Sequence, residues 1–440
     1  MDYYQGILFP SKVLVNYGTN QLFQQIFLIA PTIVPNSAAV YIIAVLSYIV
    51  PIDLAGKLVI SIFIILFPQS IIYFIGKFNP SNKWLGLFSL PFIFNQFFVL
   101  GILNYYFGII LFFFSLGIFI SMKTKREMLV FSTLCIITFL THFGAAIMLS
   151  AAIVFITLGK IIFNKDKSCI KYLFLAAPMW AMIAVFTILN KADISEIIFY
   201  SSPFEKIKNL PGTFITYSIT TDFLLLLVTL MLFCIVLFKN RHLKINEIIK
   251  NPSSWVLLCM VIIWILAPEK IGTWIRADKR AIFFIPFLLL AITTIQISKK
   301  TKKIIISSLV GIAILTVFFT AQTYSEFNLN SKKYVNALEQ IPDKNLLYLS
   351  SSELIGRFGI YESALNGYYG IEKNGISSNV FTSYMHPIRF SDFFKEKILS
   401  AKNVCAIYKY GIVYQKEYPS CFTQIKNSDG VIILKSSVIE

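Results

Sequence analysis

Residues 95–127 begin Asn95-Gln-Phe-Phe-Val-Leu-Gly-Ile-Leu-Asn104-Tyr-Tyr-Phe-Gly108, continue without a charged residue to Ile120, and then reach Lys123-Thr-Lys-Arg126. At a rise of about 1.5 Å per residue, a run of this length covers the roughly 30 Å hydrocarbon core of a bilayer. The basic residues that follow it indicate its cytoplasmic end. This stretch therefore predicts a membrane-spanning helix of defined direction, from which the other spans can be counted.

The whole chain has the composition of an α-helical polytopic membrane protein. Of its 440 residues, 57% are hydrophobic and 14% are charged, and the apolar residues form repeated blocks of span length. We predict about ten spans on this basis. They are 54–75, 84–98, 100–121, 128–141, 143–159, 170–189, 221–238, 254–267, 281–297 and 304–323.

The net charge of +17 predicts topology rather than nucleic-acid binding, because lysine and arginine fall in short clusters between apolar blocks and not on a continuous basic surface. By the positive-inside rule these clusters are cytoplasmic. The N-terminus and the C-terminal tail are then expected outside the cytoplasm. The clusters are at 77–83, 123–126, 160–171, 239–250 and 299–303.

Three regions follow from this pattern. Residues 1–53 are predicted to be an outer-loop or interfacial segment, 54–323 a multi-span helical domain, and 324–440 a small extracytoplasmic α/β domain of charged, Asn- and Tyr-rich sequence. The first twenty residues lack a signal peptide. We therefore expect a further span upstream, or a crossing within residues 20–50.

The six cysteines show no zinc or iron–sulfur ligand spacing. The sequence does not decide whether a divalent metal is a cofactor, because no ligand motif supports one. Cys405 and Cys421 lie in the polar tail and could pair if that tail is in an oxidising compartment.

The loop Pro268–Arg280 is the strongest local signal for a binding site. Its cations suit a lipid phosphate, by charge and by the bidentate geometry of arginine. The alternative is interfacial anchoring by Trp274 and snorkelling cations, and Asp278 could be their ion-pair partner. The candidate phosphate-binding residues are Lys270, Arg276, Lys279 and Arg280.

Polar residues near span ends are further candidates. Asn104 lies in a predicted hairpin, and His142 lies between two short spans. Structural hydrogen bonds explain both residues. The alternative for Asn104 is a pocket for a lipid or sugar, and the alternative for His142 is a role as a ligand or base. On the outer side, Asp2 and Asp53 are the candidate catalytic acids, although Asp53 also fits a helix N-cap.

Several stretches together resemble a poorly characterised branch of the GT-C-like membrane glycosyltransferases. They are Pro35-Asn36, Pro51-Ile-Asp-Leu-Ala-Gly-Lys57, Phe94-Asn-Gln to Leu100-Gly-Ile-Leu-Asn-Tyr105, Leu140-Thr-His-Phe-Gly144 and Arg276-Ala-Asp-Lys-Arg280.

The resemblance implies transfer of a sugar from a polyprenyl-phosphate donor to an acceptor on the extracytoplasmic face of the cell membrane. In such enzymes an acid of the first outer loop acts as base or metal ligand, a role that Asp2 would match here. Arg276 and Arg280 match the cations that hold the donor phosphate. The chain departs from the pattern because it has no Asp-Asp or Glu-Asp pair. A non-catalytic scaffold or lipid-binding subunit is therefore the alternative, and a transporter is less favoured because no span centre carries paired charges.

Overall fold

The computed structural model of the chain describes residues 3–30, 34–190, 198–214, 219–238, 245–271, 274–275, 277–295, 297–350, 361–377, 387–392, 394–396, 404–413, 419–428 and 431–438. It divides into two compact units. The terminal unit contains residues 1–60, 99–103 and 320–440, and the helical unit contains residues 61–98 and 104–319. The predicted region boundaries at 53 and 324 fall inside two helices, α4 and α17, that contribute to both units.

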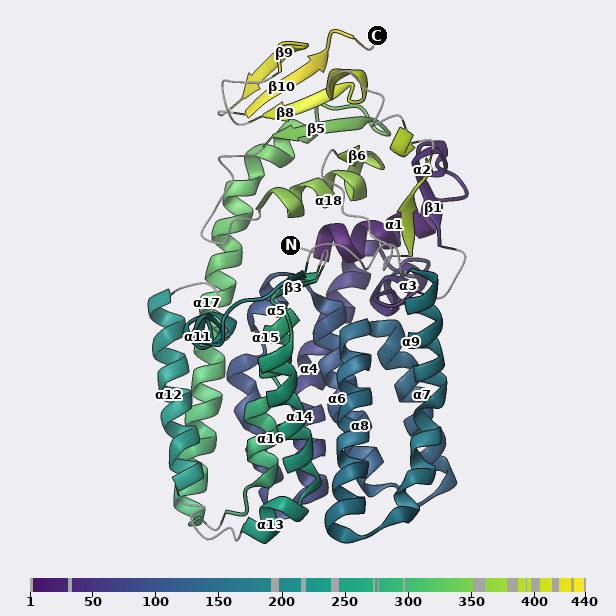
Figure 1. Ribbon diagram of the computed structural model, residues 1–440. Helices are drawn as coiled ribbons and strands as arrows, with labels where there is room; N and C mark the ends of the chain where they lie inside the picture. The colour runs from purple at the N-terminus through teal and green to yellow at the C-terminus, as the bar shows by residue number, and fades with distance from the viewer. Residues whose placement is uncertain are drawn as a thin grey trace. The chain divides into compact units, whose positions relative to one another are not determined.

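Long apolar helices form most of the helical unit (Figure 1). In the described part of the chain, six helices are long and apolar enough to cross a membrane: Ile52–Phe78, Leu103–Ser121, Phe143–Phe163, Lys167–Leu189, Thr221–Phe238 and Lys299–Glu326. A multi-pass helical membrane protein follows from them. The finer count of about ten spans remains a prediction.

The helices described in and entering this unit are α4 (Ile52–Phe78), η2 (Pro80–Phe92), α5 (Gln96–Val99), α6 (Leu103–Ser121), α7 (Lys125–Thr141), α8 (Phe143–Asn164), η3 (Lys167–Ala176), α9 (Ala177–Leu189), α11 (Pro203–Lys208), η4 (Pro211–Thr213), α12 (Ile219–Phe238), α13 (Ile245–Lys250), α14 (Pro252–Leu266), α15 (Ala277–Ile282), α16 (Ile285–Ile292) and α17 (Lys299–Leu338).

Two predicted spans, 84–98 and 281–297, differ from the observed elements. Residues 84–98 form the end of the 3₁₀ helix η2 and the single turn α5. Residues 281–297 are divided between α15 and α16. Pro91 and Pro286 supply a physical reason, because proline has no N–H to continue an α-helical ladder and clashes with the preceding turn.

Aromatic side chains join α4, α6, α15 and α16 in the core of the helical unit. The Phe67 ring on α4 lies 4.9 Å from Tyr106 on α6 and 5.9 Å from Phe283, which follows α15. The Phe112 ring on α6 lies 4.3 Å from Phe284. Because lipid chains are as apolar as these rings, close packing rather than hydrophobic transfer holds the helices together.

The terminal unit contains a five-stranded sheet of order β6-β5-β8-β10-β9. Strand β5 is parallel to β6 and β8, whereas β10 is antiparallel to β8 and β9. The helix α18 (Tyr361–Lys373) contributes Tyr369 to the core beneath the sheet. The strands are β5 (Leu346–Ser350), β6 (Ile376–Ser377), β8 (Tyr410–Val413), β9 (Phe422–Ser428) and β10 (Val431–Ser436).

The first residues of the chain pack in this same unit. The strand β1 (Phe27–Ile29) pairs antiparallel with β7 (Ile388–Phe390). The helices α1 (Phe9–Asn16) and α2 (Gln21–Ile26) share a core with them. The remaining N-terminal elements are η1 (Tyr3–Leu8) and α3 (Ala38–Leu46).

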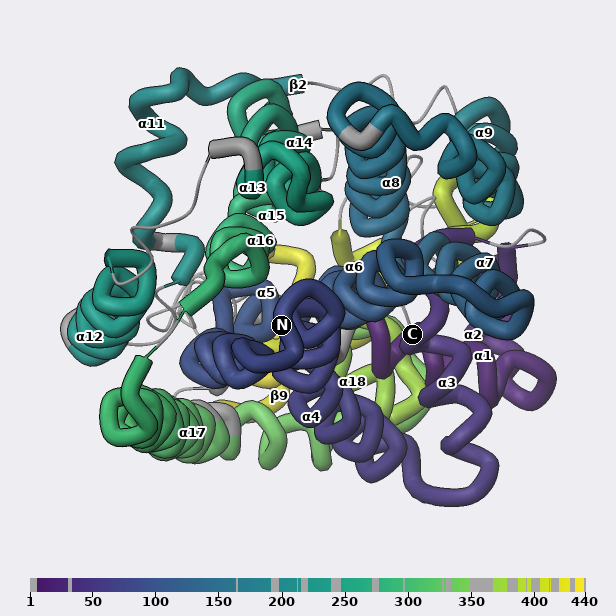
Figure 2. The backbone as a smooth tube through the Cα atoms, turned by 90° about the horizontal axis from the view of Figure 1, so that it is seen from below, coloured from purple at the N-terminus to yellow at the C-terminus, as the bar shows by residue number. Residues whose placement is uncertain are grey.

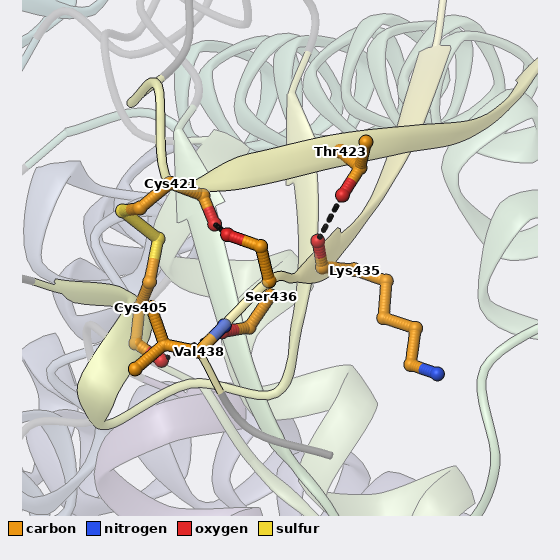
Figure 3. The surroundings of a disulfide bond; sticks show 7 residues. Cys405, Cys421, Thr423, Lys435, Ser436 and Val438 are labelled. Carbon is orange, nitrogen blue, oxygen red and sulfur yellow. Dashed lines mark hydrogen bonds between the residues drawn. A yellow bond between two sulfur atoms is a disulfide. The ribbon is translucent and has the colours of Figure 1, made fainter.

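A disulfide joins Cys405 to Cys421 (Figure 3). Cys405 belongs to the short helix η5 (Val404–Ala406), and its carbonyl accepts a hydrogen bond from the Ser436 hydroxyl at 2.8 Å. The Cys421 carbonyl accepts one from Ser437 at 2.7 Å. The pairing considered from the sequence is therefore present, and both cysteines are also tied to the end of β10.

Candidate functional site

The predicted cation loop forms a small sheet followed by a short helix. Strands β3 (Lys270–Ile271) and β4 (Trp274–Ile275) pair with each other, and β2 (Ile198–Phe199) pairs with β3. The N–H of Ala277 donates to the Glu269 carbonyl at 3.0 Å. After this turn α15, with Asp278, Lys279 and Arg280, packs against α14.

Arg280 lies in a buried polar cluster with His142 and Tyr105. Its Nη1 is 2.6 Å from Nε2 of His142, and its guanidinium carbon is 5.1 Å from the centre of the Tyr105 ring. The Tyr105 hydroxyl donates to the Arg280 carbonyl. Arg280 is 6% exposed and His142 is 3% exposed, so this cluster joins α6, the start of α8 and α15 inside the protein.

His142 is positioned by the junction between α7 and α8. Its backbone N–H donates to the Thr138 carbonyl at 2.9 Å, and its ring Nδ1 accepts from the Ala145 N–H at 3.2 Å. Guanidinium and amide N–H groups can only donate, whereas an imidazolium donates at both ring nitrogens and accepts at neither, so these two contacts favour the neutral ring. Burial, and then the charge of Arg280, hold the pKa of His142 well below its ordinary value.

Asp278 is a buried carboxyl close to other charges. It is 1% exposed, and no described residue donates a hydrogen bond to its Oδ1. Burial raises the pKa of this carboxyl, while the Lys279 N–H and the charge of Lys206 act in the opposite direction. Glu269 also raises the pKa. The end of α14 and the start of α15 therefore form a charged region with one buried acid.

Lys206 fastens α11 to the end of α14. Its ammonium donates to the carbonyls of Trp264 at 3.0 Å and Ile265 at 2.9 Å, and also to that of Ala267. The last carbonyls of a helix have no partner within it, so a lysine that donates to them is a C-cap. Lys206 was not among the residues predicted from the sequence, where it resembles any other loop cation.

Replacing Lys206 by methionine is expected to destabilise the helical unit by about 2 kcal/mol, because the apolar stem is kept while the donors to the end of α14 are lost. Lys208→Met on the same helix is the matched control, since Lys208 is exposed, and should change stability by less than about 0.5 kcal/mol. Thermal unfolding of the detergent-solubilised protein measures both changes. Equal midpoints for the two variants would show that the cap is dispensable.

An apolar cavity of about 390 Å³ lies beside this charged region. Two of its lining residues connect it to the groups above: Ile282 is one turn after Asp278 on α15, and the carbonyl of Trp264 accepts from Lys206. Its threonine hydroxyl, from Thr229, donates to the Leu225 carbonyl. The lining comprises Phe88, Phe92, Leu210, Pro211, Phe214, Leu226, Thr229, Leu230, Phe233, Val261, Trp264, Ile282, Ile285, Pro286, Phe287, Leu289 and Leu290.

The other predicted site residues that the structure describes lie outside the contact between Arg280 and His142. Lys270 is on β3, and Asn104 is the buried second residue of α6. Asp53 lies in the first turn of α4, in the terminal unit. Asp2 and Arg276 lie outside the described residues. Of the candidates, the structure brings His142 into contact with Arg280.

A second carboxyl near Asp53 was missed from the sequence. Burial and then the charge of Asp53 raise the pKa of Glu372, on α18 of the same unit, while Lys12 and Lys373 oppose the rise. No group of three or more His, Cys, Asp or Glu side chains among the described residues could hold a metal ion. Asp53 and Glu372 are far apart in the sequence, so no local motif could have paired them.

No protein family, curated protein or solved structure matches this chain. The functional conclusion therefore depends on the geometry of the site.

Proposed function

We propose that this protein binds a polyprenyl-phosphate-linked sugar in the helical unit and transfers the sugar to an acceptor on the extracytoplasmic face of the cell membrane. The observation that carries the proposal is the position of the apolar cavity beside α15. Residue Ile282 of that helix lines the cavity, and its preceding turn holds Asp278, Lys279 and Arg280. An apolar chamber with a charged end is the complement of a lipid phosphate.

The cavity suits part of an isoprenoid chain. Its volume of about 390 Å³ lies within the range of small-molecule pockets, about 300–1,000 Å³. Its side chains are apolar, and the hydroxyl of Thr229 is already used within its own helix. A polar ligand would lose its hydration there without replacement hydrogen bonds, whereas a hydrocarbon chain would not.

The cations nearby suit the phosphate. Lys279 is half-buried on α15, and its ammonium can form charge-assisted hydrogen bonds to a phosphate. Arg276 and Lys270 precede it in the sequence. In the transfer, the acceptor hydroxyl oxygen bonds to the sugar's anomeric carbon, and the bond from that carbon to the phosphate breaks. A carboxylate takes the hydroxyl proton.

Two observations support an extracytoplasmic location for the tail. The Cys405–Cys421 disulfide is a bond that persists in oxidising compartments. The lysine and arginine clusters between the spans favour the opposite side as cytoplasmic. Both observations support the same proposed compartment for the tail.

Binding of undecaprenyl phosphate to the protein in nanodiscs, measured by native mass spectrometry, tests the proposal. Leu226→Trp fills the cavity from α12 and is expected to weaken binding about tenfold. The matched control is Leu227→Trp, the next residue on α12, which does not line the cavity and should leave binding unchanged. Lys279→Gln should weaken binding of the phosphate but not of undecaprenol. Equal binding by all variants would exclude this site.

The second candidate is a lipid-binding subunit without catalytic activity. The observation that favours it is the environment of Arg280, whose guanidinium is buried against His142 and Tyr105 and so performs a structural role. The two candidates share the lipid site. Wild-type protein that binds undecaprenyl phosphate but releases no sugar from any undecaprenyl-phosphate sugar would favour the subunit.

A further inference from the structure

The segment from β2 to α11 presents large apolar side chains to its surroundings. Figure 2 shows α11 at the outer edge of the helical unit. Phe204 is the most exposed of these residues, at 76%. Single exposed apolar residues are ordinary on a protein surface, but a run of them marks an interaction site. The run comprises Ile198, Phe199, Tyr200, Phe204 and Ile207.

Local sequence determines where α11 begins, and the contact of Lys206 determines which face points outward. Ser202 and Glu205 form a capping box, and Pro203 occupies the first turn. Lys206 points inward, where it is 5% exposed. Phe204 and Ile207, three residues apart, share a face of the helix. The short helix is therefore amphipathic, with its cation fastened to the protein and its apolar residues directed away from it.

Lys206 also connects this helix to the end of an apolar helix. Its ammonium binds the carbonyls at the end of α14, an apolar helix of 15 residues. The ends of apolar helices lie at the boundary between hydrocarbon and headgroups, where aromatic rings and lysines are favoured. Further along the chain, α12 also begins with exposed apolar side chains, Phe223 and Leu224.

We infer that residues 198–208 are an interfacial membrane element, whose partner is the phospholipid bilayer itself. Phe204 and Ile207 enter the acyl-chain boundary, and the exposed ammonium of Lys208 reaches the phosphates, as in other interfacial amphipathic helices. Directly after this element in the chain, Leu210, Pro211 and Phe214 line the apolar cavity. This inference does not depend on sugar transfer.

Nitroxide labels at positions 204 and 207 test this placement in nanodiscs. The labels are introduced singly as Phe204→Cys and Ile207→Cys in a Cys234→Ser background, because Cys234 is an exposed free thiol. Collision with oxygen, which is enriched in lipid, is compared with collision with a water-soluble nickel chelate. Met231→Cys, exposed on α12, gives the lipid reference, and Glu339→Cys, exposed in the terminal unit, gives the aqueous reference.

We expect the ratio of the oxygen collision rate to the nickel collision rate at positions 204 and 207 to be several-fold higher than at position 339. It should remain below the ratio at position 231, the lipid reference. A ratio equal to that at 339 would show that the face is in water and would overturn the inference. Low collision with both reagents would also overturn it, by showing that protein covers the face. Because both side chains are exposed, neither label is expected to disturb folding, and the two positions check each other.

Discussion

Replacement of Gly86 by valine is expected to leave little folded protein, with a loss of more than about 3 kcal/mol in the free energy of unfolding. Gly86 lies in η2 against α4. A Cβ atom at this position would come within 2.6 Å of the Ile72 backbone nitrogen and Cα. Because these are backbone atoms of a long helix, they cannot rotate away as a side chain could. The two helices would have to separate, and valine would add two further methyl groups to the clash.

Gly311→Ala is the matched control for this prediction. Gly311 lies within α17, and a methyl group added there would meet no atom of the described residues within 4 Å. Alanine in a helix interior is favoured over glycine by about 1 kcal/mol, so this change should stabilise the protein slightly. The yield of monodisperse protein in detergent and its thermal midpoint measure both variants. A Gly86→Val protein with a wild-type midpoint would contradict the close approach of η2 and α4.

The membrane-spanning character of the chain could be predicted from sequence because it depends on local properties. A run such as residues 103–121 is apolar on every side and long enough to cross a bilayer, whatever it contacts. Glu127 following Thr124 likewise indicates a helix start, and the structure forms that capping box at α7. Such signals need no knowledge of the rest of the fold.

The candidate site could be predicted only in part, because its contacts join residues far apart in the chain. His142 and Arg280 were each selected for their chemistry, but nothing in the sequence indicated that they touch. The sequence did not predict the role of Lys206, because that role depends on where α14 ends in space. It did not predict the cavity either, because the cavity depends on the packing of several helices. The same reason applies to β1 and β7, whose pairing joins segments from near the two ends of the chain.

The hydrogen bonds of hydroxyl groups within the spans argue against the transporter alternative. Several hydroxyl groups within the spans donate to the carbonyl four residues earlier in their own helix, including those of Ser150, Thr157 and Thr316. A hydroxyl used in this way is less available to coordinate a passing ion or solute. These three groups therefore do not favour a polar path through the spans, and the charged region described above stays at one end of α14 and α15.

Breaking the contact between Arg280 and His142 is expected to be the other severe change. His142→Phe keeps the ring volume but removes the acceptor 2.6 Å from a buried guanidinium, and should cost about 3 kcal/mol. Arg280→Met removes the cation and should cost about 2 kcal/mol, because the buried imidazole loses its donor and Tyr105 loses its charged neighbour. The contact of the Ala145 N–H with the imidazole ring, at the first turn of α8, is lost only in the His142→Phe variant.

A double-mutant cycle measures the coupling between these residues. The variant carrying both substitutions should be about 2 kcal/mol more stable than the sum of the single changes implies, since a ring and a thioether replace both polar partners. Stabilities would be compared by unfolding in mixed micelles at a pH near neutrality, where His142 is neutral in the folded protein. Additive effects would mean that the guanidinium and imidazole act independently, and the buried cluster would then lose its assigned role in joining α8 to α15.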